Sequence, residues 1–432
     1  MFRRLVSRIA VTIVTVLVSG WVSKAQTEGT YVGYSPYSVY GVGTLHQGGT
    51  AWNRGMGGIG IATRNKRFVN TENPASITAR DSLSFMSDFT LSSKISLFKE
   101  GDKNGFNTTF NLEDFVLSFP LWKNTAMMVG IAPFSEVGYA ISSTEVDYYS
   151  TTNSFTTYGN GGLYQVFAAG AVTLWNRLSL GVQGSFIWGS INKTASNTTS
   201  DDSFLSFYTG DSLQVNNFSL KAGLQYQQPV GTRNSVILGA TYRLSTPFRG
   251  HRIHYLESGS YARTKEEHLI REDNVYLGNE IGAGISFRNS DVWSAELNYI
   301  RSDWSNSGFE AVPGFSNVGV ESAFASGLGQ SFRAGFEITP NRNDIRYFFR
   351  RCTYRAGAYY DSSYYTVNGK HVDAVGVTLG MTLPVFRWYN GLSISVDLGR
   401  RGLDSSQIGQ NYIGFNLGLN MFDIWFQKPR YE

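Results

Sequence analysis

Three glycines have the spacing found in loops that bind the phosphates of a dinucleotide. Gly55, Gly57 and Gly60 form a G-x-G-x-x-G pattern, but dinucleotide binding also needs a strand before this pattern, a helix after it and an acidic residue about 20 positions later. Residues 61–76 contain Asn, Pro and charges without a helical period. We therefore interpret the glycines as sites of close packing, and we expect no nucleotide or other cofactor.

Histidine and cysteine provide little basis for a metal site or an enzyme. His251 and His254 have the spacing to clamp a metal ion, but they lie among polar residues near a predicted loop. The other histidines are isolated in sequence: His46, His268 and His371. Cys352 is the single cysteine, which excludes a disulfide framework and a thiolate metal site. No Ser-His-Asp ordering stands out either, so we expect neither a bound metal nor catalysis.

Charged residues recur at alternate positions of the predicted strands. They carry both signs, and a charge inside a barrel must pair or contact water. One interpretation is a structural network that fills the lumen and holds an internal segment. The other is that basic side chains bind the acidic head group of a substrate. The candidate substrate-binding residues are Lys221, Arg243, Arg333 and Arg355.

The elements that would position these residues are long alternating strands. In Leu178–Gly189 the even positions are mostly apolar and the odd positions are small or polar, which gives a strand one apolar and one polar face. The pattern returns along the chain and predicts about 14 strands, an even number, as in single-chain bacterial barrels. The predicted segments are 82–97, 109–120, 125–148, 158–174, 178–194, 214–228, 234–256, 270–287, 292–304, 328–339, 351–365, 371–384, 391–399 and 410–426.

A soluble β-sandwich would also alternate, with its apolar face inward. Two features favour a membrane barrel. Strands of 12–16 residues exceed the usual length in soluble sheets. Five of the nine tryptophans lie beside proposed short turns or the chain end, as an interfacial aromatic girdle requires; they are Trp122, Trp175, Trp293, Trp388 and Trp425. We therefore predict an all-β transmembrane antiparallel barrel whose apolar face contacts lipid.

The N-terminus has the features of a secretory signal peptide. Arg3, Arg4 and Arg8 precede the apolar run Ile9–Val18, and Ser23-Lys24-Ala25 is a small-x-small cleavage site. Removal of residues 1–25 would leave 33 basic and 33 acidic residues, a balance that indicates no nucleic-acid partner. We expect export to the Gram-negative outer membrane. The predicted segments are a signal peptide (1–25), a Gly- and Tyr-rich plug (26–80) and the barrel (81–432).

The plug region carries the sharpest motifs. Gly55, Gly57 and Gly58 belong to a G-M-G-G-x-G-x-A run, which is followed by Asn73-Pro74-Ala75 ahead of the first strand. Together with Gly130-Ile131-Ala132-Pro133-Phe134 and an aromatic C-terminus, this layout resembles FadL-type outer-membrane transporters of long-chain fatty acids and aromatic hydrocarbons. The resemblance implies a 14-stranded barrel with an N-terminal plug. It also implies a lateral opening at a kinked third strand, for which Pro133 is the candidate.

Two functions follow from this resemblance. The first is passage of hydrophobic small molecules across the outer membrane, with lipids and a hydrophobic ligand as partners. Segments of the predicted outer loops such as Ser196–Ser203 are polar, however, where the family builds an apolar outer groove. The second function is therefore a non-transporting barrel that serves as a subunit of an outer-membrane secretion or assembly complex.

Overall fold

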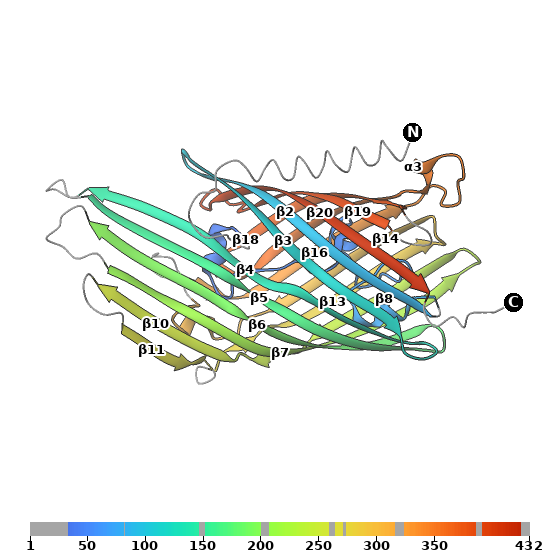
Figure 1. The fold of residues 1–432 in the computed structure, drawn as a ribbon, viewed down its shortest axis with the longest axis horizontal. Helices are drawn as coiled ribbons and strands as arrows, with labels where there is room; N and C mark the ends of the chain where they lie inside the picture. Colours follow the sequence, from blue (N-terminus) through green and yellow to red (C-terminus); the bar gives the residue numbers. More distant parts are fainter. Residues whose placement is uncertain are drawn as a thin grey trace. The chain divides into compact units, whose positions relative to one another are not determined.

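The computed structural model describes residues 33–81, 83–146, 152–199, 207–258, 264–270, 274–315, 324–385 and 391–424. Fourteen antiparallel strands form a closed barrel (Figure 1). Each barrel strand pairs with the next one along the chain, and β2 pairs with β20 to close the ring. The predicted signal peptide and its cleavage site lie outside the described residues.

The barrel strands are β2 (Ser84–Glu100), β3 (Lys103–Pro120), β4 (Thr125–Val146), β5 (Thr152–Leu174), β6 (Leu178–Thr199), β7 (Phe207–Val230), β8 (Asn234–Arg243), β13 (Asn279–Asn289), β14 (Trp293–Asp303), β16 (Leu328–Ile338), β17 (Thr353–Val367), β18 (Lys370–Leu383), β19 (Gly391–Arg401) and β20 (Gly409–Ile424). The shorter elements are η1 (Pro36–Val39), β1 (Thr44–Leu45), α2 (Ala51–Arg54), η2 (Pro74–Thr78), β9 (Thr246–Pro247), β10 (Gly250–Ser258), β11 (Thr264–Leu269), β12 (Tyr276–Leu277), η4 (Phe309–Ala311), β15 (Phe324–Ser326) and α3 (Phe348–Arg351).

The alternation of side chains orients the barrel wall as predicted. In β6, Val182 is 58% exposed on the outer surface, whereas Ser179 and Gln183 are buried. The same parity holds in β7, where Phe218 is exposed and Ser219 is buried. The apolar face therefore points outward and the polar face lines the lumen.

The segment predicted as one strand over 234–256 is divided. β8 ends at Arg243, and β10 then pairs with the outer part of β7, with Gly250 opposite Val215. Pro247 cannot donate a ladder hydrogen bond, and the next residue, Phe248, is buried under the loops. The strand is interrupted where the chain turns an aromatic side chain into the interior.

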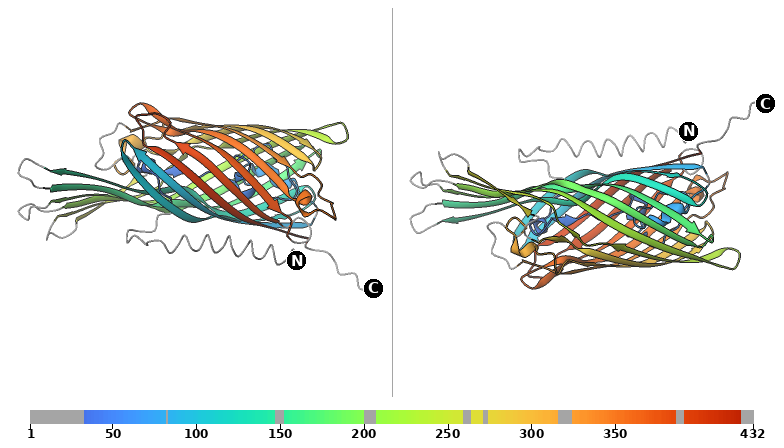
Figure 2. Two further views of the ribbon diagram at one scale, coloured as in Figure 1. Left: turned by 90° about the horizontal axis from the view of Figure 1, so that it is seen from above. Right: turned by 90° about the horizontal axis from the view of Figure 1, so that it is seen from below.

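The two ends of the barrel differ. At one end, called here the short-turn end, the turns are 121–124, 175–177, 231–233 and 290–292. At the opposite long-loop end, β4–β7 continue past the rest of the wall with β10 and β11 (Figure 2). Trp122 and Trp175 lie at the short-turn end with 78% and 80% of their surface exposed, whereas Trp388 and Trp425 lie outside the described residues.

Residues 33–81, called here the plug, lie inside the lumen (Figure 1). Trp52, Ile59 and Ala62 are at most 2% exposed, because the barrel wall surrounds them on all sides. None of the helices within the described ranges is both long enough and apolar enough to cross a membrane.

Candidate functional site

The glycines of the plug motif contact the wall formed by β16, β17 and β18. Gly57 has a φ of +71° and a Cβ added to it would lie 2.9 Å from the carbonyl oxygen of Ala334. Its N–H donates to the hydroxyl of Thr378 at 2.7 Å. Gly58 accepts a hydrogen bond from Arg333 at 3.2 Å. Glycine is needed here because the plug backbone touches the strand backbone.

Asn73, Pro74 and Ala75 attach the other end of the plug to β6 and β7. The Asn73 side chain accepts from the N–H of Ala75 at 3.0 Å and donates to the carbonyl oxygen of Ile61 at 2.7 Å. Pro74 fits against two wall glycines: a Cβ at Gly181 would lie 2.5 Å from the Pro74 carbonyl carbon, and one at Gly223 would lie 2.8 Å from its Cδ. The motif therefore packs the plug against the wall.

Arg355 is part of this attachment. It donates to the Glu337 carboxylate at 2.9 Å, and the Trp52 indole donates to the same oxygen at 2.7 Å. The Arg355 guanidinium lies over the rings of Trp52 and Phe68, with centroid distances of 5.5 and 5.0 Å. Arg355 is buried. Its contacts with Glu337, Trp52 and Phe68 attach the plug to the wall.

The other three candidate cations lie together in the lumen. Arg243 and Lys221 both face Glu280, at 3.3 and 3.9 Å. Arg333 pairs with Asp361 at 3.4 Å. All four predicted substrate-binding cations thus face carboxylates, an arrangement that favours the structural network over the head-group site.

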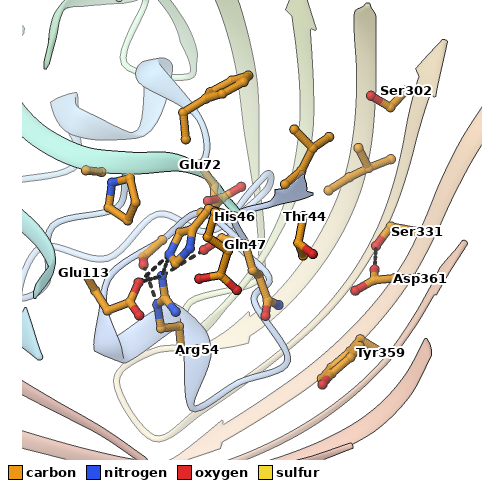
Figure 3. Close-up of a pocket in the computed structure, with 18 of the residues that line it drawn as sticks. Thr44, His46, Gln47, Arg54, Glu72, Glu113, Ser302, Ser331, Tyr359 and Asp361 are labelled. Atoms are coloured by element: carbon orange, nitrogen blue, oxygen red, sulfur yellow. Dashed lines mark hydrogen bonds and ion pairs between the residues drawn. The ribbon is translucent and has the colours of Figure 1, made fainter. Parts of the chain in front are cut away.

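A chamber of about 390 Å³ lies between the plug and the wall, and many polar and charged side chains line it beside apolar ones. His46, Arg54 and Glu113 point toward one another on one side of it (Figure 3). Arg54 lies 2.8 Å from Glu113, and His46 pairs with the same carboxylate. Tyr359 and Asp361 face the chamber from the opposite wall. The sequence did not predict this cluster. His46 is isolated in sequence, but the fold of the plug places it beside Glu113 of β3.

The hydrogen-bond ladder of the wall is interrupted beside this chamber. β3 and β4 pair only from Phe115 opposite Ile131 to Pro120 opposite Ala126. Beyond Ile131, β4 continues to Val146 paired with β5 alone on the wall, with a register shift between Pro133 and Ser135. Proline has no N–H and interrupts a ladder. The third strand of the barrel therefore separates from the second next to Pro133.

A strand of the plug covers part of this free edge. Thr44 and Leu45 of β1 pair with Glu136 and Ser135 of β4 from inside the lumen. Backbone groups that would face a gap are thus hydrogen-bonded to the plug.

The long-loop end is closed by an apolar cluster, called here the apolar cap. Trp304, Phe309 and Phe315 of the loop between β14 and β16 are fully buried. They pack with the plug residues Val39 and Val42 and with wall residues of β4–β7 and β17. The chamber is therefore roofed by close-packed side chains rather than by an open apolar groove.

Comparison with known proteins identifies the family. The family model BamG matches residues 1–432, the whole chain. The chain belongs to the BamG family. No curated protein matches it.

The fold of this BamG-family chain is that of FadL-type barrels, as the resemblance implied. The Ralstonia pickettii toluene transporter TbuX is 15% identical, with a TM-score of 0.57 over 87% of this chain and 98% of that one. A Pseudomonas aeruginosa FadL homologue is 12% identical, with a TM-score of 0.55 over 89% and 100%. The CymD monoaromatic hydrocarbon channel is 15% identical, with a TM-score of 0.55 over 86% and 97%. At such identities the similarity establishes the fold of the barrel and no more.

Proposed function

We propose that this chain is a non-transporting barrel subunit of an outer-membrane assembly or secretion complex. The observation that carries the proposal is the closure of the long-loop end by packed side chains, together with the attachment of the plug to the wall. The apolar cap packs over the long-loop end, the plug is bonded to the wall, and the chamber between them contains ion pairs such as Arg54 with Glu113 and Arg243 with Glu280. A hydrophobic substrate would have to displace paired charges that are costly to leave unpaired. The name of the family is in keeping with an envelope complex.

In this proposal the short-turn end faces the periplasm, as is usual for outer-membrane barrels. The opposite end presents the extended sheet of β4–β7, β10 and β11 to the outside. A partner can then contact the barrel at either end without any opening of the lumen.

The test is the size of the particle in native membranes. We expect the tagged chain, extracted in a mild detergent, to run on a blue native gel far above its own 47.9 kDa, with the same proteins in each preparation. A matched FadL-type hydrocarbon transporter tagged in the same cells is the control. If the chain migrates alone, as a hydrocarbon transporter should, the proposal is wrong.

Passage of hydrophobic small molecules is the second candidate, and the gap between β3 and β4 favours it. Solved structures with this fold include a toluene transporter. The gap would then be the exit, with Pro133 creating it and β1 acting as its cover.

This candidate has its own test. The double variant Leu45→Cys/Ser135→Cys places two thiols at paired positions of β1 and β4, so oxidation would fix the cover in place. If the gap is an exit, uptake of labelled toluene into vesicles should fall on oxidation and return on reduction. A chain that never takes up toluene, or does so equally in both states, excludes this route.

A further inference from the structure

The connection between β16 and β17 is unlike the other turns at the short-turn end. It spans residues 339–352, whereas turns such as 175–177 and 231–233 contain only a few residues. It contains α3, which lies at that end of the barrel (Figure 1).

This connection, called here the basic–aromatic connection, has a fixed shape. The Asp344 carboxylate accepts hydrogen bonds from the N–H groups of Arg346 at 2.9 Å and Tyr347 at 2.7 Å. The N–H of Asn341 donates to the carbonyl oxygen of Arg350 at 2.8 Å, which closes the loop. Cys352 is buried beneath it. These hydrogen bonds hold the backbone of the loop in a defined shape before any partner binds.

The apolar side chains of the connection point into solvent. Ile345 is 98% exposed and Phe349 is 62% exposed. Tyr347 is also exposed, and its ring is flanked by the guanidinium groups of Arg346 and Arg350 at 5.2 and 5.0 Å. Arginine and aromatic side chains are enriched at the centres of protein interfaces.

The basic–aromatic connection is more positively charged than the rest of the chain. The connection holds four arginines, at positions 342, 346, 350 and 351, and one acid, Asp344. The chain as a whole is near neutral after residue 25. The connection therefore forms a local excess of positive charge at the short-turn end. Guanidinium groups held against a ring face bind carboxylates in a planar, bidentate manner.

The short turns at the same end have a different composition. The short turns carry single exposed tryptophans, Trp122 and Trp175, beside Lys123 and Arg177, which is the usual pattern of a headgroup anchor. The connection differs because four guanidinium groups and three exposed apolar side chains gather in one folded loop. This composition favours a protein partner over phospholipid.

We propose that the basic–aromatic connection is a docking surface for an acidic segment of a periplasmic protein. The arginines pair with its carboxylates, while Ile345 and Phe349 contact its apolar side chains. The inference rests on the proposed role in an envelope complex, for which it names one class of partner and the surface used.

The experiment is site-specific photo-crosslinking of the full chain in its own cells. The probe is p-benzoylphenylalanine at position 345, with the same probe at Val292, an exposed residue of a short turn at the same end, as the matched control. We expect position 345 to crosslink to a periplasmic protein through a peptide rich in Asp and Glu, and we expect position 292 not to do so.

Charge variants then test the chemistry. Arg346→Glu should reduce this crosslink by about 10-fold, and Arg346→Lys should retain most of it. Arg350 is left unchanged because it pairs with Asp344 at 3.5 Å. The control Arg233→Glu, on an exposed short turn, should leave the crosslink unchanged. Folding of each variant is checked by its heat-modifiable migration on a gel.

The proposal is overturned if position 345 crosslinks to phospholipid alone, or to peptides without an acidic cluster. It is also overturned if charge reversal does not change the crosslink, or if no crosslink forms. If the chain still runs in a large complex on a blue native gel in those cases, only this surface is refuted. If the unmodified chain runs alone, the proposed function fails as well.

Discussion

The buried ammonium group of Lys193 in β6 lies 2.7 Å from the carbonyl oxygen of Val39 in the plug. It also donates to the carbonyl oxygens of Gly41 and Phe315, at 3.4 and 3.3 Å. One side chain of the wall thus joins the plug to the loop that forms the apolar cap. Because Lys193 is fully buried, its charge is satisfied by these backbone dipoles and by neighbouring groups.

Replacing Lys193 by methionine should therefore weaken both the plug and the cap. The variant keeps the length of the side chain but leaves carbonyl oxygens without their donor, at a cost of about 2 kcal/mol. We expect the folded band on a heat-modifiability gel to be lost at a lower temperature. Lys103→Met, at an exposed position of β3, is the matched control, and equal shifts in the two variants would contradict the assignment.

The plug glycine Gly57 can be tested against a glycine in open space. Gly57 and Gly101 both have a positive φ, but a Cβ at Gly57 would contact the backbone of β16 and β17, whereas one at Gly101 would meet nothing within 4 Å. Each Gly→Ala change costs about 1 kcal/mol for the backbone conformation. Gly57→Ala should cost about 1–3 kcal/mol more because of the overlap, measured as the difference in urea midpoint. Similar midpoints would mean that the plug is not seated as described.

Glu337 links Trp52 of the plug to Arg355 of the wall. Glu337→Ala would leave the Arg355 guanidinium buried without its carboxylate, a loss of about 3–5 kcal/mol. We expect the plug to loosen and planar bilayers to show a larger conductance than with the unaltered chain. Glu337→Gln retains an acceptor, so its conductance should lie between those of the unaltered chain and Glu337→Ala. Glu266→Ala, at an exposed position of β11, should not change the conductance.

Cys352 reports on the basic–aromatic connection. Burial raises the pKa of its thiol to about 11 from an ordinary value of 9, so at pH 7 the reactive thiolate should be about 100-fold scarcer than at an exposed cysteine. Maleimide labelling should be slow and should increase about tenfold per pH unit until the pH approaches the pKa. Thr232→Cys, at an exposed short turn, supplies the fast reference. Equal rates at pH 7 would mean that the connection opens freely.

The sequence was sufficient to predict the barrel because each wall residue faces either outward or into the lumen. Successive residues alternate between these two faces, so the hydrophobicity of the sequence has a period of two. The 14 predicted segments correspond one by one to the 14 strands, and the outward face of Val182 and Phe218 follows from the alternation together with the strand lengths and the tryptophans beside the turns. Two predicted strands, 234–256 and 270–287, are divided instead. Phe248 and Leu277 enter the apolar cap, and β9 pairs with β12 outside the barrel wall, which are long-range contacts.

The lumen could not be predicted in the same way. Pairing of His46 with Glu113 depends on how the plug folds inside the barrel, and the plug has no period to follow. The predicted cations Lys221, Arg243 and Arg333 do line the chamber, because inward parity places them there. Their pairing with Glu280 and Asp361 depends on strand register, which alternation does not specify.

The position of the plug in the chain has a consequence for how the barrel is made. The plug directly precedes β2, and β2 pairs with β20, the last strand of the chain. The plug also contacts strands around the whole ring, among them β2, β4, β18 and β20. The plug is therefore synthesised before every strand of the wall that encloses it. Assembly of this barrel requires either that the wall close around a segment already present or that the plug enter through an end.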